Sequence, residues 1–295
     1  MRCLSLFSGY GGLDLAVQRV FPNARVEWFA EVDPAPARVM AHRFPGAPNL
    51  GDVTKIDWLD SIRACEGEVD VLTAGYPCQP FSQAGYRRGT HDERHLWPYV
   101  LDAIRTLRPG LTFMENVLGH LSLGFDQVLG DLAACGFDAR WVSLRACDVG
   151  APHARDRLFI VVADAERFGL EAGGQSFPGP PPVAGVDDCE FPFPAGWPGL
   201  VEGRNYGATF GRYTDAVLRW EYVCGVAAPE PVMVGPRGNR VLDPRFVEWM
   251  MGLPVGWVSD VEGVTRKQAL KALGNGVVPA QGEAALRILL NLEVS

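Results

Sequence analysis

Lysine is scarce in this chain of 295 residues. Only Lys55, Lys267 and Lys271 occur among 27 basic side chains, and the rest are arginine. Arginine presents a planar guanidinium that matches phosphate groups and guanine edges. A GC-rich genome would produce the same bias, and the formal net charge of −8 argues mildly against a nucleic-acid partner. The composition therefore leaves that class of partner open.

Cysteine pairs are also missing. The seven cysteines are scattered, none forms a CxxC pair, and their odd number argues against a disulfide framework, so we expect reduced thiols. Neither the cysteines nor the five histidines cluster at ligand spacing, so no metal site is expected. Long apolar runs are absent, and the N-terminus lacks a signal-peptide pattern. We therefore expect a cytoplasmic protein without a membrane span.

What is present is an alternation of strand-like and helix-like segments. Short apolar runs occupy 2–7, 25–33, 69–75, 111–116 and 157–163, and helical spacing occurs at 95–109 and 124–137. This pattern predicts an α/β fold with a doubly wound, mostly parallel sheet. Ligands of such sheets bind beyond the carboxyl ends of the strands.

The composition changes near residue 164. Glycine, proline and aromatic residues dominate 164–245, which we expect to form a small irregular domain. Residues 1–163 and 246–295 would form the main domain. Helical patterning occurs at 212–223, 243–252 and 282–292.

A glycine-rich turn follows the first strand. Gly9, Gly11 and Gly12 allow a tight turn and close approach of a ligand. Glu31 ends the second strand, where an acid commonly holds ribose hydroxyls, and Asp52 could accept from an adenine amino group. The turn lacks a GxGxxG pattern, so these residues suggest an adenosine-containing cofactor without a pyrophosphate, such as S-adenosylmethionine. Solvated strand ends are the alternative.

Cys78 lies in "TAGYPCQPFSQAG", between Pro77 and Pro80. The prolines stiffen a loop that follows a strand at the ligand-binding edge. A lone cysteine is most often buried packing, but one on a rigid loop at this edge is a candidate nucleophile.

Charged residues follow the later strands. Glu115 comes directly after an apolar strand and is costly to bury without a partner. Arg155 and Arg157 are two residues apart, so both can face one side. They could pair with Glu115, bind a phosphate or lie exposed.

The order of these segments resembles the cytosine-5 DNA methyltransferases, with agreement over nearly the whole chain outside 164–239. The matching segments are the cofactor loop at 5–13, Glu31, Asp52, "PCQPFS" at 77–82, "ENV" at 115–117, "HARDR" at 153–157, "RVLDPRFVEWMMGLP" at 240–254 and "LGNGVVP" at 273–279. Two positions depart from the family pattern, because His153 replaces a glutamine and Gly276 a common serine.

The resemblance implies a Rossmann-like fold and methyl transfer to C5 of a flipped cytosine in a short duplex DNA sequence. Cys78 would add to C6, Glu115 would contact the N3/N4 edge, Arg157 would support the base, and Arg155 would support the site. We expect a monomer; whether an endonuclease accompanies it is open.

The implied cofactor contacts are Phe7, Ser8, Gly9, Gly11, Gly12, Leu13, Glu31, Val32, Asp52, Val53, Pro77, Leu96, Asn275 and Val277. The expected DNA contacts are Gln79, Ser82, Arg87 and Arg88 after the nucleophile, and Arg204, Arg212 and Arg219 in the irregular domain.

Three other interpretations stay open. The chain could modify cytosine in tRNA or transfer a larger group to DNA. It could be a non-catalytic DNA-binding relative, which intact Cys78, Glu115, Arg157 and Asn275 disfavour. A dinucleotide oxidoreductase is suggested only by the glycine turn.

Overall fold

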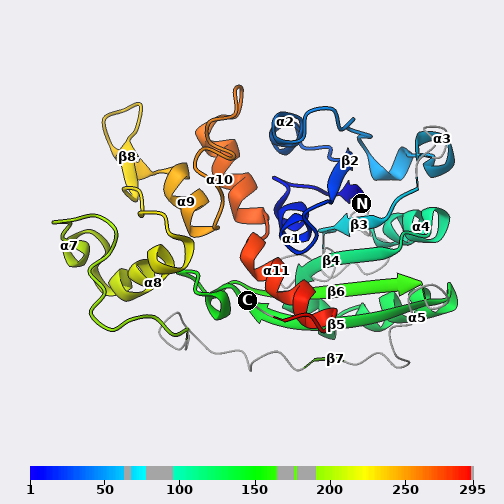
Figure 1. The fold of residues 1–295 in the computed structure, drawn as a ribbon. Helices are drawn as coiled ribbons and strands as arrows, with labels where there is room; N and C mark the ends of the chain where they lie inside the picture. The colour runs from blue at the N-terminus through cyan, green and yellow to red at the C-terminus, as the bar shows by residue number, and fades with distance from the viewer. Residues whose placement is uncertain (63–67, 78–95, 165–175, 178–190, 294–295) are drawn as a thin grey trace.

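A computed structural model describes residues 1–62, 68–77, 96–164, 176–177 and 191–293. The main feature is a seven-stranded sheet with strand order β2-β1-β3-β4-β6-β5-β7 (Figure 1). The strands are β1 (Arg2–Leu6), β2 (Arg25–Ala30), β3 (Val71–Ala74), β4 (Leu111–Val117), β5 (Phe137–Arg145), β6 (Asp156–Asp164) and β7 (Ser176–Phe177). Neighbours pair in parallel except β6, which is antiparallel to both β4 and β5. The predicted α/β fold with a mostly parallel sheet is confirmed.

Alternate residues of the strands face two separate apolar layers. On β4, Phe113 packs in the layer with α1 (Gly12–Val20) and α11 (Pro279–Leu289). Its neighbour Met114 packs in the layer with α4 (Trp97–Leu107) and α5 (Phe125–Ala134). Because α1 and α11 share one layer, the C-terminal segment packs beside the first helix of the chain (Figure 1).

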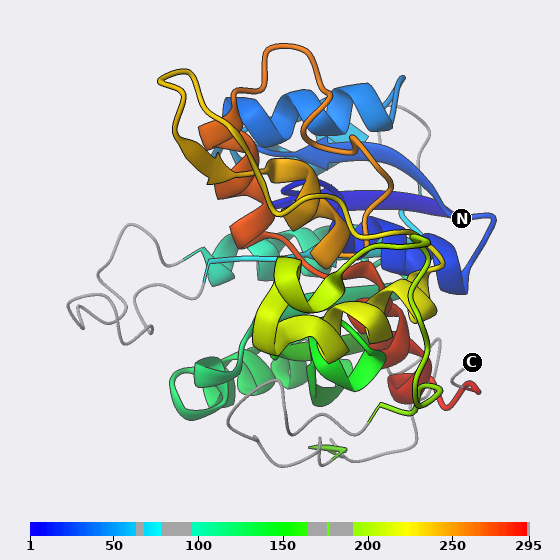
Figure 2. The same cartoon turned by 90° about the vertical axis from the view of Figure 1, so that its left-hand side faces the viewer.

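A third apolar cluster joins the irregular region to the C-terminal part of the chain. It contains Trp220 from α8 (Thr214–Cys224), Trp249 from α9 (Pro244–Met250) and Leu273 from α10 (Arg266–Asn275). The short helix α7 (Tyr206–Phe210) belongs to the same cluster. These helices lie to the left of the sheet in Figure 1 and toward the viewer in Figure 2. The division into two domains at 164 and 245 stays a prediction.

The remaining elements are short. Helix α2 (Pro34–Arg43) begins at an Asp33 cap, whose carboxylate accepts from the Ala35 amide. Helix α3 (Trp58–Ile62) follows a 3-10 turn at Val53–Lys55, and a hairpin forms from β8 (Val232–Val234) and β9 (Arg240–Leu242). Among the described residues, no helix combines the length and apolar character that a membrane span requires.

The expectation of reduced thiols is wrong for Cys147. Cys3, Cys135 and Cys224 are free, whereas Cys147 is disulfide-bonded. Cys147 is buried in the 3-10 turn after β5. Sequence spacing does not reveal which cysteines meet in space, so the pattern gave no sign of this bond.

A buried carboxylate fixes the loop after α9. Glu248 is 1% exposed and accepts hydrogen bonds from the amides of Gly256 at 3.0 Å and Val258 at 2.6 Å and from the hydroxyl of Ser259 at 3.0 Å. Buried backbone amides need such partners. The loop's position therefore depends on the charge of a single side chain.

Glu248→Gln should lower the free energy of unfolding by about 2–4 kcal/mol, because an amide group cannot accept at both positions and leaves buried donors unpaired. Denaturant unfolding monitored by tryptophan fluorescence measures the change. The exposed Glu262→Gln is the matched control. Equal stabilities of the two variants would contradict the role assigned to Glu248.

Candidate functional site

A pocket of about 710 Å³ lies at the carboxyl ends of β1, β2, β3 and β4, with α10 and the segment after it as its other wall. This is the edge at which doubly wound sheets bind ligands. Of the predicted cofactor residues, Phe7, Ser8, Gly9, Gly12, Leu13, Glu31, Val32, Pro77, Leu96, Asn275 and Val277 line it, as do Glu115 and Arg157. The sheet topology thus collects residues from both ends of the chain.

The first wall is the turn after β1. Phe7 has a positive φ of 52°, and Gly11 has a φ of 85° as the residue that precedes α1. A Cβ at Gly11 would also lie 2.8 Å from the Phe44 ring. Gly11 therefore shapes the turn from outside the pocket rather than lining it.

Glu31 extends from the end of β2 into this turn. Its carboxylate accepts from the Gly9 amide at 3.0 Å and from the Asp33 amide at 2.8 Å, while burial raises its pKa. The neighbouring Val32 is 67% exposed although apolar. An acid that is held rigidly beside an exposed valine suits a ligand with a ribose and an aromatic base.

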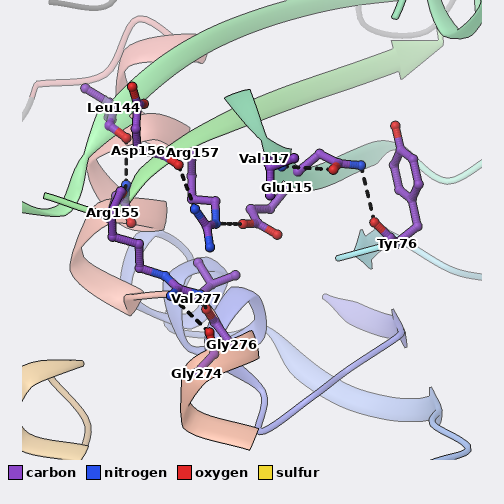
Figure 3. Close-up of polar contacts among 12 residues, drawn as sticks. Tyr76, Glu115, Val117, Leu144, Arg155, Asp156, Arg157, Gly274, Gly276 and Val277 are labelled. Atoms are coloured by element: carbon purple, nitrogen blue, oxygen red, sulfur yellow. Dashed lines mark hydrogen bonds and ion pairs between the residues drawn. The ribbon is translucent and has the colours of Figure 1, made fainter. Parts of the chain in front are cut away.

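Glu115 and Arg157 form an ion pair on the pocket floor. The Arg157 Nε lies 2.7 Å from the Glu115 Oε1, and both side chains are largely buried (Figure 3). The pair forms because β6 runs against β4, so Arg157 lies opposite Val117, two residues from Glu115. Burial raises the pKa of Glu115, and the two guanidiniums of Arg157 and Arg155 oppose that shift.

Arg155 stabilises the pocket wall that the end of α10 and the segment after it form. It donates to the Gly274 carbonyl at 3.0 Å and also to the Gly276 carbonyl (Figure 3). Gln281 donates to the Leu144 and Arg155 carbonyls at 2.7 and 2.9 Å. Arg155 and Arg157, which are two residues apart in the sequence, thus have different partners: backbone carbonyls for Arg155 and the Glu115 carboxylate for Arg157.

The end of β3 is anchored before the predicted nucleophile. The Tyr76 hydroxyl lies 2.9 Å from the His120 Nε2, and the Tyr76 carbonyl accepts from the Asn116 side chain at 3.2 Å. Pro77 follows at the pocket wall. Cys78, Gln79, Ser82, Arg87 and Arg88 lie outside the described residues, so their roles stay predictions.

Several predicted contacts have other surroundings. Asp52 is half-buried and caps the 3-10 turn at Val53–Lys55, where its carboxylate accepts from the Thr54 amide at 3.0 Å. Val53 packs in the core, and neither residue lines the pocket. Arg219 is 6% exposed and donates to the Gly150 and Ala151 carbonyls. Its burial and these two hydrogen bonds give it a packing role instead of the predicted DNA contact.

The other two arginines of the irregular region also differ from each other. Arg204 donates to the Ala228 carbonyl and pairs with Glu230 at 2.8 Å. Arg212 is exposed and donates to the Tyr213 hydroxyl at 2.7 Å. Of the three arginines predicted in this region, only Arg212 is placed at the surface.

Sequence reasoning missed several residues of the pocket, and Asp14 and Lys271 are the charged ones on its helices. Asp14, on α1, accepts from the hydroxyls of Ser5 and Thr73 at 2.7 Å each and joins the ends of β1 and β3. Lys271 pairs with Asp33 at 2.6 Å across the rim. An acid within the apolar face of a helix was the available signal for Asp14; nothing local marked Lys271. Among the described residues, no group of side chains could hold a metal ion.

Comparison with known proteins identifies the family of this chain. The family described as C-5 cytosine-specific DNA methylase matches residues 1–179, and the chain belongs to that family. The type II methyltransferase M.NlaX of Neisseria lactamica is 30% identical over 165 residues, which are 54% of this chain and 51% of that protein. Thus the match spans about half of that relative.

Two further similarities extend over more of the chain. Type II methyltransferase M1.ScrFI of Lactococcus lactis is 26% identical, with 100% of this chain and 79% of that protein covered. The structure of S. pombe Dnmt2 methyltransferase superposes with a TM-score of 0.67 at 18% identity, covering 99% of this chain and 98% of that one. At that identity the likeness concerns the fold.

The departure at His153 has a structural explanation. Its Nε2 lies 3.2 Å from the Met250 carbonyl, to which it can donate when neutral. Burial and the nearby Arg155 lower its pKa to about 4. A neutral histidine here joins the loop before β6 to the end of α9, so it serves the contact between two segments of the chain.

This contact predicts a pH dependence of stability. Between about pH 6.5 and 4 the unfolded chain binds a proton at His153 that the folded chain does not, so stability decreases as the pH falls. From pH 7 to pH 5 the protein should lose about 1–2 kcal/mol relative to His153→Gln. Denaturant unfolding at both pH values measures this, with exposed His42→Gln as the control. Equal losses of stability in the parent protein, His153→Gln and His42→Gln would contradict this role of His153.

Proposed function

We propose that this chain transfers a methyl group from S-adenosylmethionine to C5 of a flipped cytosine in duplex DNA. The observation that carries the proposal is the buried Glu115–Arg157 ion pair on the floor of a pocket that Pro77 borders. That floor can receive a polar ring edge near Pro77, the residue that precedes Cys78 in the sequence. Family membership supports the same chemistry.

The proposed donor fits the residues of the pocket. S-adenosylmethionine supplies an electrophilic methyl group on a sulfonium. Glu31 would accept from its ribose hydroxyls, Phe7 and Val32 would pack on its adenine, and the turn at Gly9–Gly12 would allow its methionine end to approach the backbone. A volume of about 710 Å³ is within the range of small-molecule sites.

The base would be activated by covalent addition. The Cys78 thiolate adds to C6, and electron density moves to C5 as Glu115 donates a proton or hydrogen bond at the N3/N4 edge. C5 then bonds to the methyl carbon as the carbon–sulfur bond of the donor breaks. A base removes the C5 proton, and elimination of Cys78 restores the aromatic ring. The target carbon is inaccessible in a stacked duplex, which is why the base must leave the helix.

Glu115→Gln should lower kcat by about 10²- to 10³-fold, because the amide keeps the shape but cannot donate the carboxyl proton. Affinity for S-adenosylhomocysteine should change less than about twofold, since the proposed cofactor contacts are elsewhere. Single-turnover methylation and calorimetry measure the two quantities, and exposed Asp126→Asn is the control. Unchanged kcat would refute the role of Glu115.

Covalent trapping tests the addition of the Cys78 thiolate to C6 independently of the other proposed steps. A duplex with 5-fluorocytosine at the target should form a denaturation-resistant complex, and Cys78→Ser should abolish both the complex and turnover. If Cys78→Ser methylates at a near-normal rate, addition at C6 is wrong.

The experiment that tests the whole proposal is sequencing of 5-methylcytosine in DNA from cells that express the chain. Methylation confined to one short sequence motif is the expected result. Parallel assays on tRNA distinguish an RNA substrate, and mass spectrometry of the product base identifies a larger transferred group.

The β8–β9 hairpin provides further proposed DNA contacts, which the sequence pattern did not predict. Arg237 and Arg240 are exposed at its turn and second strand, and Val234 is 74% exposed. The Arg266 Nε donates to the Leu242 carbonyl at 2.9 Å, so the hairpin is attached to the first residue of the pocket helix α10. Arginines on an element held against the site suit phosphate contacts.

The variant with both Arg237→Ala and Arg240→Ala should bind duplex DNA more weakly at low salt, with a slope of log K against log[salt] about 1–2 units shallower. Fluorescence anisotropy from 50 to 200 mM salt measures the slope. Arg25→Ala, exposed at the amino end of β2 and thus away from the pocket, is the control. An unchanged slope in the double variant would exclude phosphate contacts by the hairpin.

A further inference from the structure

Gly276, the second departure from the family pattern, lies against Tyr10. A Cβ at position 276 would be 1.9 Å from Cε1 of the Tyr10 ring, 2.3 Å from Cζ and 2.6 Å from Cδ1. Non-bonded carbon atoms require about 3.5–4.0 Å. Even alanine is therefore excluded at position 276 while the tyrosine ring keeps its place.

The backbone of Gly276 does not itself require glycine. Its φ of −78° and ψ of −173° lie in the extended region that other residues adopt readily. This distinguishes Gly276 from the glycines with positive φ in the same site. The requirement for glycine comes from the neighbouring side chain alone.

The Tyr10 ring is fixed on several sides. Tyr10 is 0% exposed, and its hydroxyl donates to the Val277 carbonyl at 2.6 Å. Its own carbonyl accepts from the Trp257 Nε1 at 2.8 Å. Trp257 in turn is held by Arg43, whose Nε donates to the Trp257 carbonyl at 2.8 Å and whose guanidinium lies over its ring. The ring therefore cannot move aside without breaking buried contacts.

The segment that Tyr10 contacts is a wall of the pocket. Gly276 and Val277 both line it, and Arg155 donates to the Gly276 carbonyl. The Val277 carbonyl that accepts from Tyr10 also lies 2.4 Å from where a Cβ at Gly12 would be. The wall is thus held between a tyrosine from the first turn and an arginine from the loop before β6.

We propose that Tyr10 is a positioning residue for the cofactor pocket and that its ring occupies the space which any side chain at position 276 would need. Residues 10 and 276 are therefore a matched pair, because tyrosine at one requires glycine at the other. This inference rests on the proposed function for the identity of the ligand. The contact between the two residues does not depend on that identity.

A double-mutant cycle tests the pair, with Tyr10→Leu, Gly276→Ser and the double variant compared by calorimetry with S-adenosylhomocysteine. Gly276→Ser should weaken binding at least about tenfold, because serine displaces the wall. The double variant should recover most of that loss, since leucine leaves room for the serine. If Gly276→Ser binds like the parent, or if the double variant is no better than Gly276→Ser, the pairing is wrong.

Two additional variants identify the physical cause. Gly276→Ala should weaken S-adenosylhomocysteine binding as much as Gly276→Ser does, because the Cβ is responsible for the clash. If Gly276→Ala binds like the parent, only the hydroxyl matters and the steric argument is overturned. Tyr10→Phe retains the ring and removes only the hydrogen bond to Val277, so its loss should be a few-fold. Gly130→Ala, on α5 with open space around it, is the control for a glycine substitution.

Kinetics distinguish positioning from general stability. A displaced wall raises KM for the methyl donor while kcat at saturating donor stays within about threefold, whereas partial unfolding lowers kcat at unchanged KM. The second pattern in Gly276→Ser would overturn the positioning role. If the parent protein itself does not bind S-adenosylhomocysteine, the proposed function fails instead. The pairing of residues 10 and 276 is then tested by the thermal unfolding midpoints of Tyr10→Leu, Gly276→Ser and the double variant. If the shift in the double variant equals the sum of the two single shifts, the pairing is refuted.

Discussion

The site depends on the pairing of a buried carboxylate with a guanidinium at the junction of β4 and β6. A charge at Glu115 would be prohibitively costly in this position without a partner. The partner arrives because β6 is antiparallel to its neighbours, so its first residues lie beside the last residues of β4. The single reversed strand of the central sheet thus has a direct chemical purpose, because a parallel strand would place its beginning at the opposite edge.

The loop that leads into β6, just before Arg157, also organises the C-terminal wall of the pocket. Arg155 reaches the carbonyls of Gly274 and Gly276, and His153 reaches Met250. Three alternate residues of "HARDR" therefore contact the end of α9, the segment after α10 and the floor of the pocket. This explains why a motif with no reacting atom of its own can matter for the arrangement of the site.

Much of this arrangement could be predicted from the sequence. Each of the five apolar runs, at 2–7, 25–33, 69–75, 111–116 and 157–163, corresponds to a strand of the sheet. The motif order indicated Glu115, Arg157 and the glycine turn, which line the pocket or shape it. Strand β5 was missed because "FDARWVSLR" intersperses polar residues, and two of its buried residues are the arginines Arg140 and Arg145. The burial of Arg219 and the Tyr10–Gly276 contact were also missed. Both result from tertiary packing between distant segments, which local pattern does not encode.

The shared layer of α1 and α11 has a consequence for biosynthesis. Translation delivers the glycine turn, Glu31 and Glu115 long before Asn275, Val277 and the helix that carries Gln281. A chain still on the ribosome therefore lacks the pocket wall that α10 and the segment after it form, however well its sheet has formed. Under the proposed function, such a nascent chain would have an incomplete donor site, so methylation would begin only after the C-terminal segment has packed beside α1.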